Sequence, residues 1–184
     1  MNCRISFISY KLDVASKIGV MNLNFNNTTT GNSMEQYVIF LLGNKEFGVN
    51  IHQTREIISG SDLTFMPNAP DFVCGVINLR GEIVPVIDLK ERLKLKELQN
   101  QNNEEKIIIV AINETLIGMK VDDVEEIIRL EMDNIEDPPE ISQKINKDYV
   151  SGVGKLNDKL LILLDLDKIL SRKEIEKLDN IEMK

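Results

Sequence analysis

The stretch FVCGVINLRGEIVPVIDLKERL, residues 72–93, contains two short runs rich in β-branched residues on either side of a turn at Arg80–Gly81. Such runs, bounded by turn residues, are typical of β-strands. The same pattern returns 77 residues later as YVSGVGKLNDKLLILLDLDKIL, residues 149–170. In this alignment Gly75 corresponds to Gly152, Leu79 to Leu156, and Asp88–Leu89 to Asp165–Leu166.

A second pair of stretches matches at a slightly different offset. VIFLLGNKEFGVNIHQTREII at residues 38–58 aligns with IIVAINETLIGMKVDDVEEII at residues 108–128, an offset of 70 residues. Two blocks that recur in the same order indicate an internal duplication. The larger offset of the later block indicates an insertion, most simply in the acidic, proline-containing stretch 132–148. The matched pairs here are Gly48 with Gly118, Glu56 with Glu126, and Ile57–Ile58 with Ile127–Ile128.

The β-rich runs follow one another without long amphipathic helices between them, which favours antiparallel barrels or sandwiches over a βαβ sheet. We therefore predict a mainly β fold of two copies, at about residues 38–96 and 106–164, each the size of a small five-stranded barrel. A copy of this size is marginally stable alone, so the two are expected to pack together. The polar stretch 97–105 is the expected joint.

Each copy ends in a helical pattern that begins at an aspartate. Asp88, with Glu91 three residues later, forms a capping box ahead of a short helix. Asp165 or Asp167 opens a C-terminal helix over about residues 166–180, which is expected to dock across the other copy. Residues 1–33 include an Asn- and Thr-rich stretch with little to bury, and we expect them to form a flexible N-terminal extension.

The composition excludes several kinds of partner. The chain of 184 residues has 22 Lys plus Arg against 30 Asp plus Glu, a net charge of −8. An acidic chain cannot neutralise phosphates over a large surface, so neither nucleic acid nor an anionic membrane is an expected partner. Its apolar runs are far shorter than the roughly 18 residues that span a bilayer, so no direct membrane insertion is expected. Cys3 and Cys74 form no disulfide or zinc pattern, which favours the cytoplasm.

Few residues are suited to catalysis or to metal binding. His52 is the single histidine, and neither a G-x-S-x-G elbow nor a phosphate-binding glycine loop occurs. Acidic pairs such as Asp122–Asp123 and Glu125–Glu126 could coordinate magnesium. A solvated strand edge accounts for them better, and the Asp165–Asp167 pair stands where a helix cap is needed. We expect no catalytic residue, no metal and no cofactor.

Arg80 stands between Leu79 and Gly81 at a turn between two apolar runs. A turn position exposes a guanidinium, or lets it clamp neighbours through its five directed donors. Pro85 within the second run indicates a strand edge or a bulge. From the residues alone, two roles for Arg80 are equally supported. It is either a structural residue that bonds loop carbonyls or an acidic neighbour, or an interaction residue.

At this segment the sequence resembles the CheW family, the coupling proteins of bacterial chemotaxis. The resemblance runs from about Met34 to Leu178 and rests on several motifs in a fixed order. These are V-I-F-x-L-G-x-x-x-F-G-V-x-I at residues 38–51, R-E-I-I at 55–58, P-N-A-P-D-F-V-x-G-V-I-N-L-R-G-E-I-V-P-V-I-D-L at 67–89, V-D-x-V at 121–124 and Y-V-S-G-V-G-K-L at 149–156.

The resemblance implies a fold of two intertwined SH3-like β-barrel subdomains. It also implies a non-enzymatic adaptor that links the cytoplasmic signalling tips of chemoreceptors, the methyl-accepting chemotaxis proteins, to the regulatory domain of the histidine kinase CheA. Such a protein would be cytoplasmic and recruited to membrane-associated receptor arrays. The receptor tips are α-helical hairpins, which the family receives in the groove between its subdomains.

The resemblance also implies site residues. Those expected in or beside the receptor groove are Glu56, Gly75, Asn78 and Arg80, with Ile107, Ile108 and Ile127 as its apolar lining. Kinase contacts in the family use apolar residues at the barrel ends, and Ile141 stands where relatives place such a residue.

Two alternatives stay open beside the coupling protein. The first keeps the fold but makes this sequence the coupling-like module of a larger signalling protein, either a CheV-type adaptor or CheA itself. A CheV chain is expected to continue into a receiver domain, and CheA to carry a kinase domain upstream. The second alternative is a small hydrolase or metal enzyme that uses the acidic clusters, for which the sequence supplies no nucleophile, base or ligand set.

Overall fold

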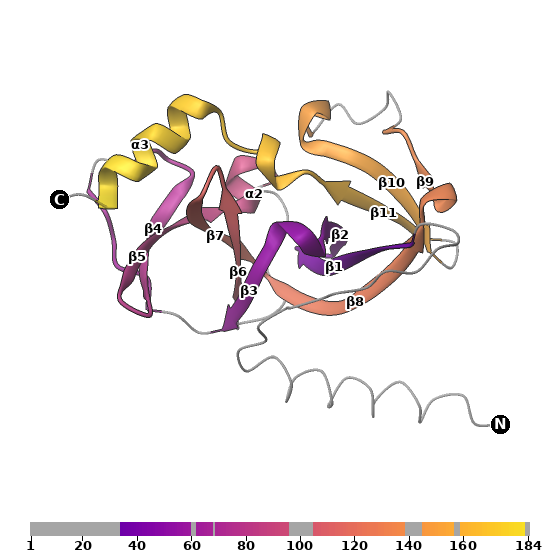
Figure 1. The fold of residues 1–184 in the computed structure, drawn as a ribbon, viewed down its shortest axis with the longest axis horizontal. Helices are drawn as coiled ribbons and strands as arrows, with labels where there is room; N and C mark the ends of the chain where they lie inside the picture. The colour runs from indigo at the N-terminus through magenta and orange to yellow at the C-terminus, as the bar shows by residue number, and fades with distance from the viewer. Residues whose placement is uncertain are drawn as a thin grey trace.

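The structure is a computed structural model that describes residues 34–59, 62–67, 69–95, 105–138, 145–156 and 159–182. The extension expected at residues 1–33 and the stretch 97–105, apart from its last residue, lie outside these ranges. The described chain is mainly β, as the sequence predicts, and its strands form two sheets (Figure 1). Within the described residues, no helix has the length and apolar character needed to cross a bilayer.

The first sheet has the strand order β8-β1-β2-β11-β10-β9, and the second has the order β3-β6-β7-β5-β4. Neighbouring strands are antiparallel except β2 with β11 and β5 with β7, which are parallel. The strands of the first sheet are β1 (Met34–Leu42), β2 (Lys45–Asn50), β8 (Asp123–Glu131), β9 (Ile135–Glu136), β10 (Val150–Leu156) and β11 (Lys159–Leu164). Those of the second are β3 (Thr54–Ser59), β4 (Val73–Leu79), β5 (Glu82–Asp88), β6 (Lys106–Ile112) and β7 (Thr115–Val121).

The two sheets reproduce the duplication, but they do not follow the boundaries of the two copies. Shifting the second sheet by the repeat offsets converts its order into β8-β1-β2-β11-β10, which is the order of the first sheet without β9. The first hairpin of each copy, β1–β2 or β6–β7, therefore lies in the sheet that holds the later strands of the other copy. The stretches 38–96 and 106–164 are repeats in sequence, and each contributes strands to both sheets.

Short helical segments follow the strands. They are η1 (Ile51–Gln53), α2 (Leu89–Arg92), η2 (Met132–Asn134), η3 (Lys147–Tyr149), η4 (Leu166–Lys168) and α3 (Arg172–Glu182). The Asp88 carboxylate accepts from the Glu91 N–H at 3.1 Å and so caps α2 as expected. The C-terminal helical pattern divides into η4 and α3, because Ser171 begins a new helix with its hydroxyl and N–H both bonded to Glu174.

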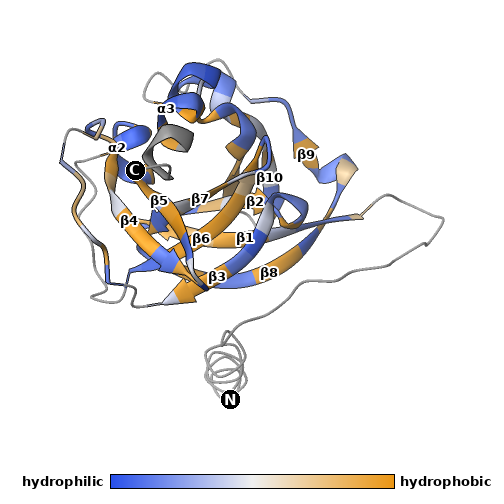
Figure 2. Ribbon diagram, turned by 60° about the vertical axis from the view of Figure 1, so that its left-hand side comes forward, coloured by the Kyte–Doolittle hydropathy of each residue, from blue (hydrophilic) through white to orange (hydrophobic). Residues whose placement is uncertain are grey.

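Alternate residues of the first hairpins face different apolar cores. One face of β1, β2, β6 and β7 meets the other copy in a shared core, which Ile175 and Leu178 of α3 complete. The opposite face belongs to a smaller core within each sheet. Figure 2 shows the apolar strands inside and the polar faces of α2 and α3 outside. The shared core includes Val38, Phe40, Leu42, Phe47, Val49, Ile108, Val110, Ile112, Ile117, Met119, Ile175 and Leu178.

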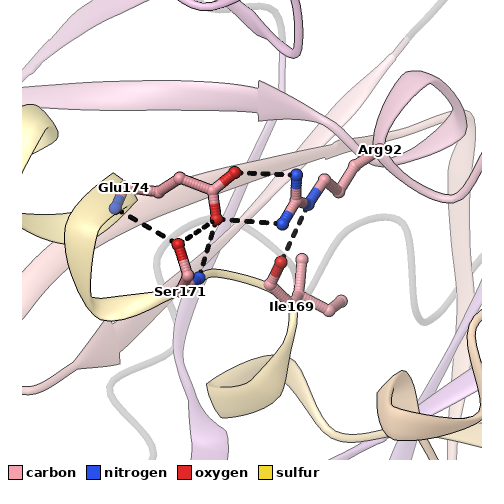
Figure 3. A network of polar contacts seen from close by, with 4 residues as sticks. All are labelled: Arg92, Ile169, Ser171 and Glu174. Carbon is pink, nitrogen blue, oxygen red and sulfur yellow. Dashed lines mark hydrogen bonds and ion pairs between the residues drawn. The ribbon is translucent and has the colours of Figure 1, made fainter.

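Arg92 fastens α3 to the first copy (Figure 3). Its Nη atoms donate to the two carboxylate oxygens of Glu174 at 2.9 and 3.0 Å, and its Nε donates to the carbonyl of Ile169 at 2.8 Å. The guanidinium also lies over the Phe72 ring, 4.8 Å from its centroid. Burial acts to raise the pKa of Glu174, but the bonds from Ser171 and the Arg92 charge outweigh it and hold that pKa below its usual range. The C-terminal helix of the second copy is thus bound to the end of the first.

Two further ion pairs join the copies around α2. Nζ of Lys90 lies 2.7 Å from Oδ1 of Asp122, whose side chain is only 4% exposed. The other oxygen of Asp122 accepts from the N–H of Gly43, in the β1–β2 turn. Nζ of Lys120 lies 2.8 Å from Oδ2 of Asp88. The acidic run near Val124 therefore includes a buried carboxylate that serves the fold.

Candidate functional site

The β4–β5 turn holds Arg80 in a specific backbone conformation. Leu79 and Glu82 are the last paired residues of the hairpin, so Arg80 and Gly81 form a two-residue turn. Their φ angles are +56° and +97°, as a type I′ turn requires. The Gly81 N–H donates to Oδ1 of Asn78 at 2.7 Å. A left-handed conformation costs a residue other than glycine roughly 1 kcal/mol. The arginine at position 80 therefore destabilises the turn relative to a glycine there.

Glu56 on β3 is the partner of this arginine. Nη2 of Arg80 donates to Oε2 of Glu56 at 2.7 Å, and the two side chains are 58% and 9% exposed respectively. Because β3 and β4 are opposite edges of the second sheet, the pair brings the two ends of that sheet together. The largely buried carboxylate would be costly without a cation beside it. The arginine neutralises it, and the exposed guanidinium keeps donors available to a partner.

Gly75 lies in β4 before this turn, at a position where the chain allows no side chain. A bulge separates it from Val73 in the pairing with β5. A Cβ atom at Gly75 would lie 2.6 Å from the carbonyl oxygen of Thr64, whose backbone makes two hydrogen bonds with Val76. Gly152, its counterpart in β10, is crowded in the same way by β9. The absence of a side chain at Gly75 therefore lets the segment around Thr64 pack against β4. In this way Gly75 shapes the hairpin that carries Arg80.

The surroundings of this turn offer little for catalysis. Cys74 is half-buried, and its Sγ donates to the carbonyl of Val86 at 3.3 Å. Burial raises the pKa of this thiol to about 11, so it is protonated at neutral pH and a poor nucleophile. Among the residues that the structure describes, no three His, Cys, Asp or Glu side chains are grouped to hold a metal ion. The exposed Arg80 guanidinium, paired with the largely buried Glu56 carboxylate, is suited to recognition of another protein.

Comparison with known proteins identifies the family. The model of the CheW-like domain matches residues 36–174. The chain belongs to the CheW-like domain family. It is 36% identical to the chemotaxis protein CheW of Klebsiella aerogenes over 149 residues, which cover 80% of this chain and 88% of that protein. The identity to chemotaxis protein CheW of Treponema pallidum is 32%, covering 79% of this chain and 88% of that one.

A solved structure agrees with this assignment. The crystal structure of the scaffolding protein TtCheW from Thermoanaerobacter tengcongensis superimposes with a TM-score of 0.72 at 31% sequence identity, covering 82% of this chain and 96% of that chain. The chain also resembles the chemotaxis protein CheV3 of Helicobacter pylori, at 32% identity over 126 residues, which make up 40% of that protein. The CheW-like fold of this chain is thus supported by both sequence and structure.

The structure of the CheW-like chain brings some of the expected site residues together and separates others. Glu56, Asn78 and Arg80 meet at the β4–β5 turn. Ile127 is 41% exposed on β8, in the first sheet.

Ile107 and Ile108, expected to line a groove, are instead buried, at 4% and 0% exposure. The reason is that β6 lies between β3 and β7 with a core on each face, so Ile107 belongs to the second-sheet core and Ile108 to the shared core. The expected kinase-contact residue, Ile141, lies outside the described residues.

The structure also shows apolar surface that was not among the expected site residues. Ile83 on β5 is 39% exposed and Leu160 on β11 is 68% exposed. These residues correspond in the repeat, because Ile83 pairs with Asn78 and Leu160 pairs with Lys155. Phe65, in the segment that crosses β4, is 82% exposed. The signal in the sequence was the alignment of residues 72–93 with residues 149–170, which places an aliphatic residue at both equivalent positions.

Proposed function

We propose that this CheW-like chain is a non-catalytic adaptor that couples the signalling tips of chemoreceptors to the regulatory domain of the histidine kinase CheA. The observation that carries the proposal is the family match over residues 36–174, with relatives that are chemotaxis proteins and a solved scaffolding protein. The adaptor does no chemistry. It fixes the kinase relative to the receptor, so that a receptor conformation biases the population of active kinase.

The receptor contact in this proposal is centred on the Arg80 guanidinium. An exposed cation with directed donors suits carboxylates or carbonyl oxygens on a helical hairpin, and the bond to the largely buried Glu56 carboxylate holds the guanidinium in place. Asn78 fixes the turn, Gly75 shapes its hairpin, and Ile127 supplies exposed apolar surface. Ile107 and Ile108 lie on β6, the strand that pairs with β3 beside Glu56.

The kinase contacts in this proposal use exposed apolar residues of the two sheets. Ile83 and Leu160 are equivalent in the duplication, so the chain offers two related surfaces, one on each sheet. Ile141 is assigned to the same task by the family pattern. Since CheA's regulatory domain is built like CheW, alternating contacts between the two kinds of module can be heterologous and can close into rings.

Binding of the full chain to a soluble receptor signalling-tip fragment and, separately, to a CheA regulatory domain tests the proposal. We expect both to bind. Arg80→His should abolish tip binding and leave kinase binding intact, whereas Arg172→His, at an exposed arginine that begins α3, should affect neither. Leu160→Asp should have the opposite selectivity. A chain that binds neither partner would refute the adaptor function.

The second candidate is the coupling-like module of a larger chemotaxis protein. It is favoured by the match to CheV3, of which the aligned part makes up 40%. In a CheV-type protein the same surfaces would serve the same partners, and an attached receiver domain would regulate them. The length of the native gene product, measured by intact mass from its source, distinguishes the two.

A further inference from the structure

β8 is a long strand at the edge of the first sheet (Figure 1). It has nine residues and, among the described strands, pairs with β1 alone, so its other edge is outside the ladder of that sheet. The strand at the opposite edge, β9, has only two residues. Native proteins protect long edge strands by covering them or by making them unfit for pairing, because such strands accept further strands. β8 is therefore a place where a strand can be added.

Ile127, in the middle of β8, forms apolar surface beside this edge. It pairs with the buried Val38 of β1, so the two side chains lie on the face of the sheet that forms the shared core, yet Ile127 is 41% exposed. Its counterpart in the duplication, Ile57 on β3, is partly buried against that core. Two more exposed apolar residues, Met34 and Met132, lie at the end of the β1–β8 pair. The margin of the shared core is thus uncovered at β8.

The chain contains a segment that matches this edge in pattern and in reach. Residues 21–26, MNLNFN, alternate apolar side chains with asparagines, which is the pattern of a strand with one buried face. Seven residues connect this segment to Met34, and they can span up to about 23 Å. Ile127 is four residues along β8 from the partner of Met34. Four strand residues and two strand spacings correspond to about 14 Å and about 10 Å, so the segment can reach Ile127.

The charges favour the same placement. Residues 1–33 contain three basic residues and one acidic residue, whereas the rest of the chain contains 19 basic and 29 acidic residues. β8 itself has four carboxylates and one arginine. A basic segment is attracted to an acidic strand. Its covalent attachment also gives it an effective concentration on the order of millimolar, which a second copy of the chain does not have in dilute solution.

We propose that residues 21–26 add to the open edge of β8 as a further strand, with Met21, Leu23 and Phe25 covering Ile127. Ile127 is part of the proposed receptor surface, so the added strand and a receptor tip exclude each other there. The segment is an internal competitor that a tip has to displace. This competition rests on the proposed receptor-coupling function, whereas the docking of the segment does not.

Hydrogen exchange of the full chain, measured by mass spectrometry, tests the docking. We expect the amides of residues 21–26 to exchange at least about fivefold more slowly than in a free peptide of residues 1–33. The protection should be the same at low and high protein concentration, because the contact is within one chain. Leu23→Ser, on the apolar side of the segment, should remove the protection, and Asn24→Ser, on its polar side, should keep it. Ile127→Ser should remove it from the β8 side.

Binding of the receptor signalling-tip fragment tests the competition. A surface that is open in about one chain in five binds its partner about fivefold more weakly than a surface that is always open. Leu23→Ser should therefore bind the tip about fivefold more tightly than the parent chain does. Asn24→Ser should bind it as the parent chain does. Both substitutions lie outside the folded sheets, so neither is expected to unfold them.

The outcomes separate this inference from the adaptor function. Unprotected amides at residues 21–26 of the parent chain refute it, and so does protection that appears only at high concentration, which assigns the β8 edge to a second copy. If Leu23→Ser loses the protection but binds the tip no more tightly, the segment does not compete with receptors and the inference is refuted, while the adaptor function stands. If neither the parent chain nor Leu23→Ser binds the tip, the adaptor function fails, and protected amides still support the docking.

Discussion

Replacing Arg80 by glycine separates the role of the guanidinium from that of the turn. At a φ of +56°, glycine removes a backbone strain of roughly 1 kcal/mol. Its greater freedom in the unfolded chain destabilises the folded state by about 0.5 kcal/mol, which offsets half of that gain. Loss of an ion pair whose cation is 58% exposed costs about 0.5 kcal/mol, and the unpaired Glu56 carboxylate costs about 1 kcal/mol more. The sum is a net loss of about 1 kcal/mol.

The assay compares stability with binding in the same preparation. In thermal unfolding of the full chain, Arg80→Gly should lower Tm by about 2–4 °C, and Arg80→Ala should be less stable still because alanine keeps the left-handed cost. Binding to the receptor signalling-tip fragment should fall at least about tenfold in both, the loss of a charged hydrogen bond. The reasoning is refuted if Arg80→Gly unfolds the chain, or if it leaves tip binding unchanged.

Further substitutions test the packing around the site. Arg92→Met should lower the free energy of unfolding in urea by about 2 kcal/mol, since it removes the bidentate bond to Glu174. This difference should shrink in acid. The folded pKa of Glu174 is lowered, so its contribution is present above the unfolded pKa and is lost as pH falls through the folded one; a difference that is constant with pH would contradict this. Gly118→Ala should cost about 2 kcal/mol. Gly48→Ala should cost less. Its new Cβ would lie 2.8 Å from the flexible end of Leu163, whereas the Cβ of Gly118→Ala would lie 2.8 Å from the stiff β-branched methyl of Ile107. Equal losses of unfolding free energy in the two variants would argue against this explanation.

The sequence predicted the strands well because the duplication made each pattern appear twice. The turn at Arg80–Gly81 and the cap at Asp88 depend on local chemistry, and both occur where expected. The burial of Ile107 and Ile108 was also readable. The run KIIIVAI at residues 106–112 is apolar without alternation, which indicates a strand covered on both faces. The family pattern instead assigned both isoleucines to the apolar lining of the receptor groove.

The exchange of hairpins between sheets could not be read from the sequence. The pairing of Phe47 with Ile162 joins residues 115 positions apart, and no local signal specifies such a partner. The Glu56–Arg80 ion pair could not be predicted from the sequence either, since the residues supported a structural role and an interaction role for Arg80 equally. The structure shows that the arginine bonds an acidic neighbour and is still largely exposed, so both roles fit one residue.

The exchange of hairpins has a consequence for the order in which the protein is made. β1 and β2 leave the ribosome first, but the strands that flank them in the sheet are β8 and β11. The apolar residues on both faces of the first hairpin therefore stay uncovered until β8 and β11 have been synthesised. Pairings over such long sequence distances fold slowly and leave strand edges open to aggregation. A nascent chain that stops before β11 lacks a complete first sheet.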